Sequence, residues 1–135
     1  MELDPTLGLT FVLLVTFQFK HYMADFPLQS SWMLNKRLTG WDFAIPLVAH
    51  CCVHAGLTLV ITLIVNPDLW WLAFVDFCLH FIMDRIKSAP HYLGRFNEPT
   101  RQSCWNCFGL DQFVHHMTHY FIIFTLVTSQ HRFVG

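Results

Sequence analysis

The sequence predicts an all-α integral membrane protein, a single domain over residues 1–135 built as an up-down bundle of four helices. Hydrophobic residues make up 54% of the chain and charged residues only 13%, about half the charged share of an average soluble domain. Four apolar stretches account for most of the length. Six of the eight basic residues lie in or beside two of the connections between them. Lipid is therefore the expected surroundings of the bundle.

The four apolar stretches set the expected helix bounds. Residues 43–65 contain no charged side chain and are long enough to span a hydrocarbon core about 30 Å thick. The other helices are expected at about residues 6–25, 69–86 and 109–128, each interrupted by ionisable residues. None of these stretches is apolar on one face alone, as a surface helix of a soluble protein would be.

The connections carry their own signals. Pro27 can open and Gly40 can close a short helix that lies in the membrane interface between the first two helices. Its apolar residues fall roughly on one face: Leu28, Trp32, Leu34 and Leu38. Residues 88–107 are polar, contain two prolines and a glycine, and are expected to form a loop.

Charge asymmetry predicts the orientation. The basic residues of the two loop regions are Lys36, Arg37, Arg85, Lys87, Arg95 and Arg101. The opposite side carries Glu2, Asp4 and Asp68, with Arg132 as the exception. The positive-inside rule then places both basic loops in the cytoplasm and both termini outside it. The five tryptophans fall near the expected helix boundaries, as interfacial residues do.

Composition also excludes some partners. A net charge of −1 argues against a nucleic-acid partner, which calls for a basic surplus. The odd number of cysteines disfavours a disulfide scaffold, and the single CxxC of Cys104 and Cys107 lacks a second pair for a zinc ribbon. The N-terminal apolar stretch has no small-residue cleavage site and is expected to be retained as a helix.

Histidines and aspartates recur four residues apart on every expected helix, which places them on one face. Because chain direction alternates in an up-down bundle, all these pairs fall in the membrane half next to the basic loops. Ionisable side chains facing lipid would cost about 2.5–3.5 kcal/mol each, so they must face one another. Imidazole and carboxylate are ligands of zinc, iron and manganese. The expected metal ligands are His21, Asp25, His50, His54, His80, Asp84, Asp111 and His115.

Eight ligands suit one or two divalent ions, zinc first, with iron or manganese as alternatives. A second set lies a turn deeper or beside the ligands: Asp76, His119, Gln29, Lys87 and Gln112. His91 and His131 are expected to be ordinary surface residues, and His116 points away from His115. A hydrogen-bonded network without metal remains the alternative, since buried polar groups can satisfy each other.

Four motifs together resemble a known family: His21-Tyr-Met-Ala-Asp25-Phe-Pro-Leu-Gln29, His50-xxx-His54, His80-xxx-Asp84-xx-Lys87 and Gly109-Leu-Asp111-Gln112-xx-His115. The chain is similar to a small polytopic membrane-protein family of phages and bacteria whose function is unknown. It more distantly resembles membrane-bound metal-dependent hydrolases, which are linked to helical zinc phospholipases and nucleases. These resemblances imply a place in the bacterial inner membrane and hydrolysis of a phosphoester.

The expected function is a metal-dependent hydrolase that acts on a phosphoester or phospholipid at the cytoplasmic face. Asp84 or Asp111 would serve as general base, and the basic loop residues, Lys87 among them, would hold an anionic headgroup. Gln29 and Gln112 suit contacts to ligands or substrate. A di-iron membrane oxidoreductase and a non-enzymatic phage effector or ion-conducting bundle are the alternatives. The substrate and the oligomeric state are not determined by the sequence.

Overall fold

The computed structural model describes residues 4–130, so Glu2, His131 and Arg132 lie outside the described part. Over these residues the chain forms α-helices and short 3-10 helices and no strand, which confirms the all-α prediction. The elements are α1 (Pro5–Asp25), η1 (Ser31–Arg37), α2 (Ala44–Val65), η2 (Pro67–Leu69), α3 (Leu72–Ser88), η3 (Leu93–Phe96) and α4 (Gln102–Gln130).

Local sequence explains where the helices begin and end. The Asp4 carboxylate accepts a hydrogen bond from the Thr6 backbone N–H (2.9 Å) at the start of α1, and a proline opens that helix. The helices α1, α2 and α3 each end one or two residues before a proline, which cannot continue a helix. Gly40, before α2, has a φ of 69°, a left-handed conformation that suits glycine.

Two expected elements need correction. The short element between the first two helices is the 3-10 helix η1, which begins at Ser31 and not at Pro27. The fourth helix begins at Gln102 and not near residue 109, so part of the expected loop is helical. The indole N–H of Trp105 donates to the Pro99 carbonyl (2.9 Å), which ties the first turn of α4 to the preceding chain.

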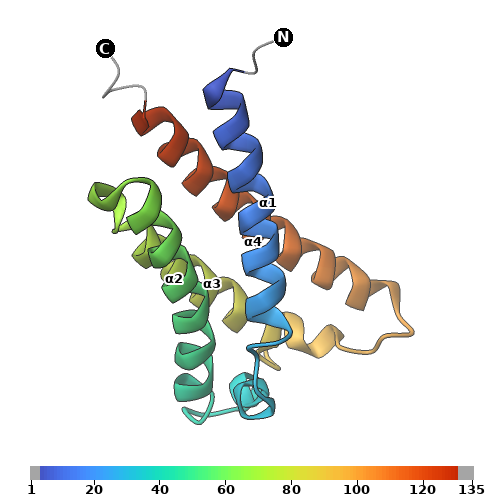
Figure 1. Cartoon of the computed structure of the whole chain (residues 1–135). Coiled ribbons are helices and arrows are strands. Elements are labelled where there is room, and N and C mark those ends of the chain that lie inside the picture. The colour runs from blue at the N-terminus through green and yellow to red at the C-terminus, as the bar shows by residue number, and fades with distance from the viewer. Residues whose placement is uncertain (1–3, 131–135) are drawn as a thin grey trace.

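The helices run alternately up and down (Figure 1). The start of α1, the element η2 and the end of α4 lie at one end, while η1 and η3 lie toward the other. The apolar core near the first end contains Leu13, Phe17, Leu72, Ile122, Ile123 and Leu126. The other half of the interior holds the buried histidines and aspartates beside a few apolar side chains such as Leu47 and Met83. Burial of apolar surface does not stabilise a polar interior. Its polar groups must therefore form hydrogen bonds or ion pairs with one another or with a ligand.

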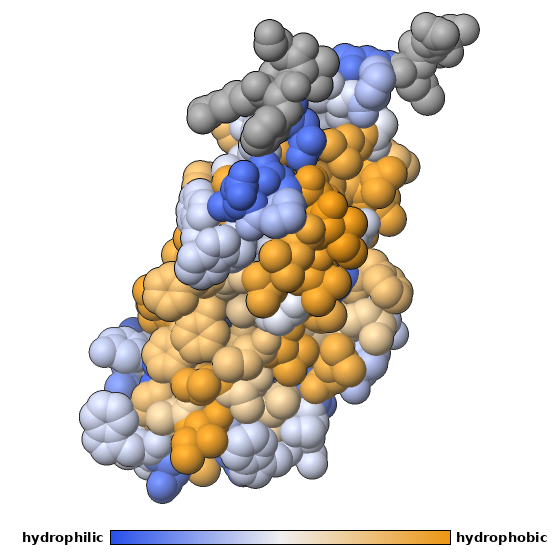
Figure 2. All heavy atoms as spheres, turned by 60° about the vertical axis from the view of Figure 1, so that its left-hand side comes forward, coloured by the Kyte–Doolittle hydropathy of each residue, from blue (hydrophilic) through white to orange (hydrophobic). Residues whose placement is uncertain are grey.

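The outer surface of the bundle is strongly apolar. Large side chains such as Phe11, Ile64 and Phe124 are 66%, 79% and 67% exposed. Figure 2 shows apolar side chains over much of the length of the face it draws, with hydrophilic ones more frequent toward the ends. Within the described residues, α1 and α2 are long and apolar enough to cross a membrane, by length and composition.

Candidate metal centre

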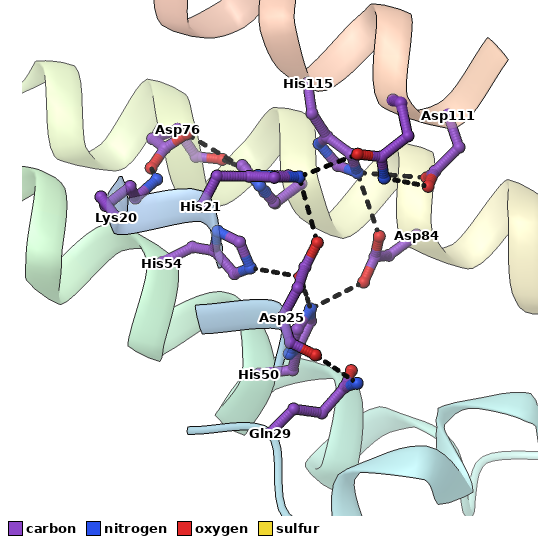
Figure 3. Close-up of polar contacts among 12 residues, drawn as sticks. Lys20, His21, Asp25, Gln29, His50, His54, Asp76, Asp84, Asp111 and His115 are labelled. Carbon is purple, nitrogen blue, oxygen red and sulfur yellow. Dashed lines mark hydrogen bonds and ion pairs between the residues drawn. The ribbon is translucent and has the colours of Figure 1, made fainter. Parts of the chain in front are cut away.

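The structure brings the eight expected ligands together where the four helices approach one another. The end of α1, the first half of α2, the second half of α3 and the middle of α4 each contribute two of them. The close-up in Figure 3 shows the carboxylates of Asp25 and Asp84 lying between the surrounding imidazoles. Seven of the eight are buried, and the eighth, Asp25, has a side chain 23% exposed. The residue spacing within helices thus leads to one cluster and not to four separate pairs.

Imidazoles and carboxylates alternate across the bundle. His54 Nε2 lies 3.0 Å from Asp25 Oδ1, and His50 Nε2 lies 3.5 Å from the same oxygen. On its other side His50 Nε2 is 3.1 Å from Asp84 Oδ2. His115 Nε2 continues the series, at 3.2 Å from Asp84 Oδ1 and 3.1 Å from Asp111 Oδ1. A chain of nitrogen–oxygen contacts therefore connects α1 to α4 through α2 and α3.

These distances suit metal coordination as well as hydrogen bonding. Zinc binds imidazole nitrogen and carboxylate oxygen at about 2.0–2.2 Å, so two ligands of one ion stand about 3.0–3.5 Å apart. The contacts between nitrogen and oxygen in the cluster measure 3.0–3.5 Å. Little side-chain movement would then be needed for an ion to enter.

Three groups of side chains could each hold a metal ion, with ligand atoms within 4.8 Å of one another. They are Asp25 with His50 and His54, Asp84 with Asp111 and His115, and His21 with His80 and His119. The first two, called here the mixed groups, combine carboxylate and imidazole. The third, called the histidine group, contains no carboxylate and includes His119, which the sequence had placed in the second set.

Asp76 orients a ligand. Its Oδ1 lies 3.0 Å from His80 Nδ1, which leaves His80 Nε2 as the nitrogen that faces other partners. A carboxylate on the far nitrogen of an imidazole is the usual support of a metal-binding histidine. Asp76 itself is fully buried, and its Oδ2 accepts hydrogen bonds from Lys20 Nζ and the Thr58 hydroxyl, both at 2.6 Å.

Lys20 is the member of the site that the sequence reasoning missed. Its side chain is 3% exposed, inside α1, and its ammonium group forms the buried ion pair with Asp76. The search for ligand-type residues passed over it because lysine is not a metal ligand of the expected kind. A signal was present in the sequence, because Lys20 is the one basic residue inside the first apolar stretch and directly precedes His21.

Two further lysines reach the mixed groups from the loop side. Lys36 Nζ donates to Asp84 Oδ2 (2.6 Å), and Lys87 donates to Asp111 Oδ2. Each carboxylate thus keeps its other oxygen toward His115. The lysine side chains are 14% and 36% exposed, so this side of the cluster is the one nearest to solvent or headgroups.

The two glutamines of the second set lie differently. Gln112 bridges two expected ligands, since its Oε1 lies 3.2 Å from His21 Nε2 and its amide donates to Asp111 Oδ2 at 3.2 Å. Gln29 donates to the backbone carbonyl of Asp25 (2.9 Å), so it fixes the end of α1 and does not contact the carboxylate.

Within residues 4–130, six buried histidines keep one ring nitrogen without a hydrogen-bond partner. For His80 this nitrogen is Nε2; for the others it is Nδ1: His21, His50, His54, His115 and His119. An unsatisfied buried polar atom costs about 1–3 kcal/mol, and native proteins contain few of them. So many in one cluster fit a site that completes its contacts with a bound group.

Residues outside the cluster behave as ordinary ones. His91 is exposed, and His116 contacts Gln18 (3.0 Å) on the bundle surface. Cys104 and Cys107 are free and partly exposed in the first turns of α4. Arg85 donates to two backbone carbonyls at the end of η1, so it holds that element against α3.

A model of a family described as "Protein of unknown function (DUF3307)" matches residues 11–134. The match covers most of the chain, so the chain belongs to this family. No curated protein and no solved structure matches it.

Proposed function

We propose that this family member is a membrane-embedded metal-dependent hydrolase that cleaves a phosphoester at the cytoplasmic face of the membrane. The observation that carries the proposal is that two mixed imidazole–carboxylate groups share a connection through Asp84, which contacts His50 of one group and His115 of the other. Paired divalent ions held in this way are typical of enzymes that hydrolyse phosphoesters.

Each residue of the mixed groups has a proposed role. His50, His54 and Asp25 would hold one ion, and His115 and Asp111 a second, with Asp84 between them. When bound, divalent ions supply an activated water and polarise a phosphoryl oxygen. Asp25 has the most exposed carboxylate of the site, at 23%, which favours it over Asp84 (6%) and Asp111 (0%) as the group that takes a proton from water.

The lysines on the loop side match the charge of a phosphoester. Lys36 and Lys87 donate to the carboxylates that would bind the ions, and both side chains are partly exposed. An anionic headgroup approaching from this side would meet two ammonium groups next to the ions. Zinc or manganese is the proposed metal, since both suit sites of imidazole and carboxylate.

The membrane location is part of the proposal. All four α-helices expose large apolar side chains. The exposed tryptophans form two levels, with Trp32, Trp41 and Trp105 toward the loop end and Trp70 and Trp71 near η2. This separation suits the two interfaces of a bilayer, with the bundle between them.

Hydrolysis is tested with purified protein in detergent, loaded with zinc or manganese. We expect the protein to release the leaving group from p-nitrophenyl phosphate, bis-p-nitrophenyl phosphate or a phospholipid. Addition of EDTA should abolish this hydrolysis. Asp25→Asn should lower the rate about 100-fold or more, because it removes the proposed proton acceptor, which contributes about this much, and also weakens the binding of one ion. His91→Ala, on the surface, should hydrolyse at the wild-type rate. Metal-loaded protein that cleaves none of these substrates would contradict the proposal.

Orientation is tested in a variant whose five cysteines are replaced by serine, with single cysteines introduced at exposed positions. We expect cysteine at Arg37 or Arg95 to be labelled from the cytoplasmic side and cysteine at Asp68 from the opposite side, as the basic loops require. A membrane-impermeant maleimide on intact cells and on inverted vesicles gives the measurement. Labelling of position 68 from the cytoplasm would reverse the orientation.

A di-iron oxidoreductase is the second candidate, because carboxylates and imidazoles from facing helices of a bundle also hold iron pairs. The arrangement of Asp84 between the mixed groups is compatible with it. Iron as the retained metal, together with spectra that change with oxygen, would favour oxidation over hydrolysis.

A further inference from the structure

Three histidines not used by the mixed groups lie together deeper in the bundle. His21, His80 and His119 come from three different helices, and each offers a ring nitrogen within 4.8 Å of the others. Each precedes or follows a member of a mixed group by four residues on its own helix, on the side away from the loops. They are 6%, 1% and 0% exposed, so the histidine group is closed to solvent.

His80 is held so that one nitrogen stays available. His80 Nδ1 lies 3.1 Å from the backbone carbonyl oxygen of Asp76 and 3.0 Å from its carboxylate Oδ1, and the buried Nε2 has no hydrogen-bond partner in the described part of the chain. His21 and His119 also keep a buried nitrogen without a partner. Three neighbouring imidazoles that each keep a buried nitrogen without a partner form an incomplete arrangement, which a single cation would complete.

The charge of Lys20 does not exclude a cation here. Its ammonium lies 2.6 Å from the Asp76 carboxylate and 3.4 Å from His119 Nε2, so the carboxylate is its main partner. The ion pair is neutral as a unit. Asp76 is also held by the Thr58 hydroxyl, which keeps the carboxylate in place behind His80.

We propose that His21, His80 and His119 form a separate all-nitrogen site for one zinc-like divalent ion. Three imidazoles with an open fourth position are a common zinc arrangement, and imidazole also suits copper, nickel and iron. Magnesium and manganese prefer oxygen ligands, so they would favour the mixed groups. This proposal rests on the ring nitrogens of the three histidines and does not depend on hydrolysis by the mixed groups.

Zinc stoichiometry in variants tests this site. The triple variant Asp25→Ala with Asp84→Ala and Asp111→Ala, called the aspartate variant, should keep about one zinc ion per chain, because both mixed groups lose their carboxylates and the histidine group is intact. His119→Ala should lose about one ion relative to wild type, whereas the neighbouring His116→Ala should lose none. With Co²⁺ as the probe, the visible absorption of a tetrahedral ion should persist in the aspartate variant and disappear when His119→Ala is added to that variant.

A variant that keeps all three histidines covers the case in which His119→Ala fails to fold. Asp76→Asn should lower the zinc affinity of the histidine group about 10–100-fold, because it removes the carboxylate that orients His80. Folded His119→Ala that retains the wild-type zinc content would overturn the proposal, and so would unchanged zinc affinity in Asp76→Asn. If the aspartate variant binds as much zinc as wild type, the mixed groups bind none: the proposed hydrolase fails and this site remains.

Discussion

Asp84→Ala is expected to lower the metal content and to destabilise the bundle more than any other single substitution among the expected ligands. The Asp84 carboxylate has partners on three elements: Lys36 in η1, His50 on α2 and His115 on α4. Its removal takes away the carboxylate that connects the mixed groups. Among the described residues Lys36 then has no carboxylate partner, and His50 and His115 each keep only one, Asp25 and Asp111. Loss of one partner from a buried ionic contact costs about 3–5 kcal/mol.

The measurement is metal stoichiometry together with thermal unfolding in detergent, with and without EDTA. His54→Ala should change both quantities in the same direction, since it removes the imidazole 3.0 Å from Asp25. EDTA should lower the melting temperature of wild type, and should lower that of Asp84→Ala less, because metal binding stabilises the folded state and this variant has fewer ions to lose. His91→Ala is the surface control and should match wild type. Equal metal content in His54→Ala and wild type would indicate a hydrogen-bonded network without metal.

Lys20→Met is expected to have the second largest effect, again about 3–5 kcal/mol of unfolding free energy. Methionine fills a similar volume but leaves the fully buried Asp76 without its ammonium partner. The remaining donors, the Thr58 hydroxyl and His80, do not supply a full counter-charge. Thermal or denaturant unfolding in detergent measures the loss.

A double variant separates the ion pair from simple packing. Lys20→Met combined with Asp76→Asn should recover much of the stability, because no unpaired charge then remains. The exposed pair of Arg101 and Glu98 is the matched control: Arg101→Met should cost less than about 1 kcal/mol. If Lys20→Met is no more destabilising than Arg101→Met, the buried ion pair does not stabilise the fold.

The sequence was sufficient to predict which residues lie together, because helical spacing and the alternating direction of the helices can both be derived from the sequence alone. The i, i+4 pairs on α1 and α2 required no knowledge of packing. How the ligands divide into groups was not predictable in this way. His50 contacts Asp25 and Asp84 because α1, α2 and α3 approach at particular angles, which one sequence does not specify.

The elements that were predicted less well are those set by local tertiary contacts. The first turns of α4 contain polar residues and a CxxC, which resemble a loop, but Trp105 ties them to Pro99. The element η3 fits against the end of α3 because Gly94 lacks a side chain: a Cβ there would lie 2.5 Å from the Ser88 carbonyl oxygen. Such close approaches depend on individual atomic contacts, which no repeating pattern in the sequence reveals.

The central claim, that the histidine and aspartate cluster binds divalent metal, is tested most directly by the metal content of the wild-type protein. Elemental analysis of protein purified in detergent and dialysed without chelator gives the number of ions per chain. The mixed groups predict about two zinc or manganese ions, and the histidine group adds about one zinc ion. Protein that is folded, retains no metal and takes up none when zinc or manganese is supplied would contradict the claim.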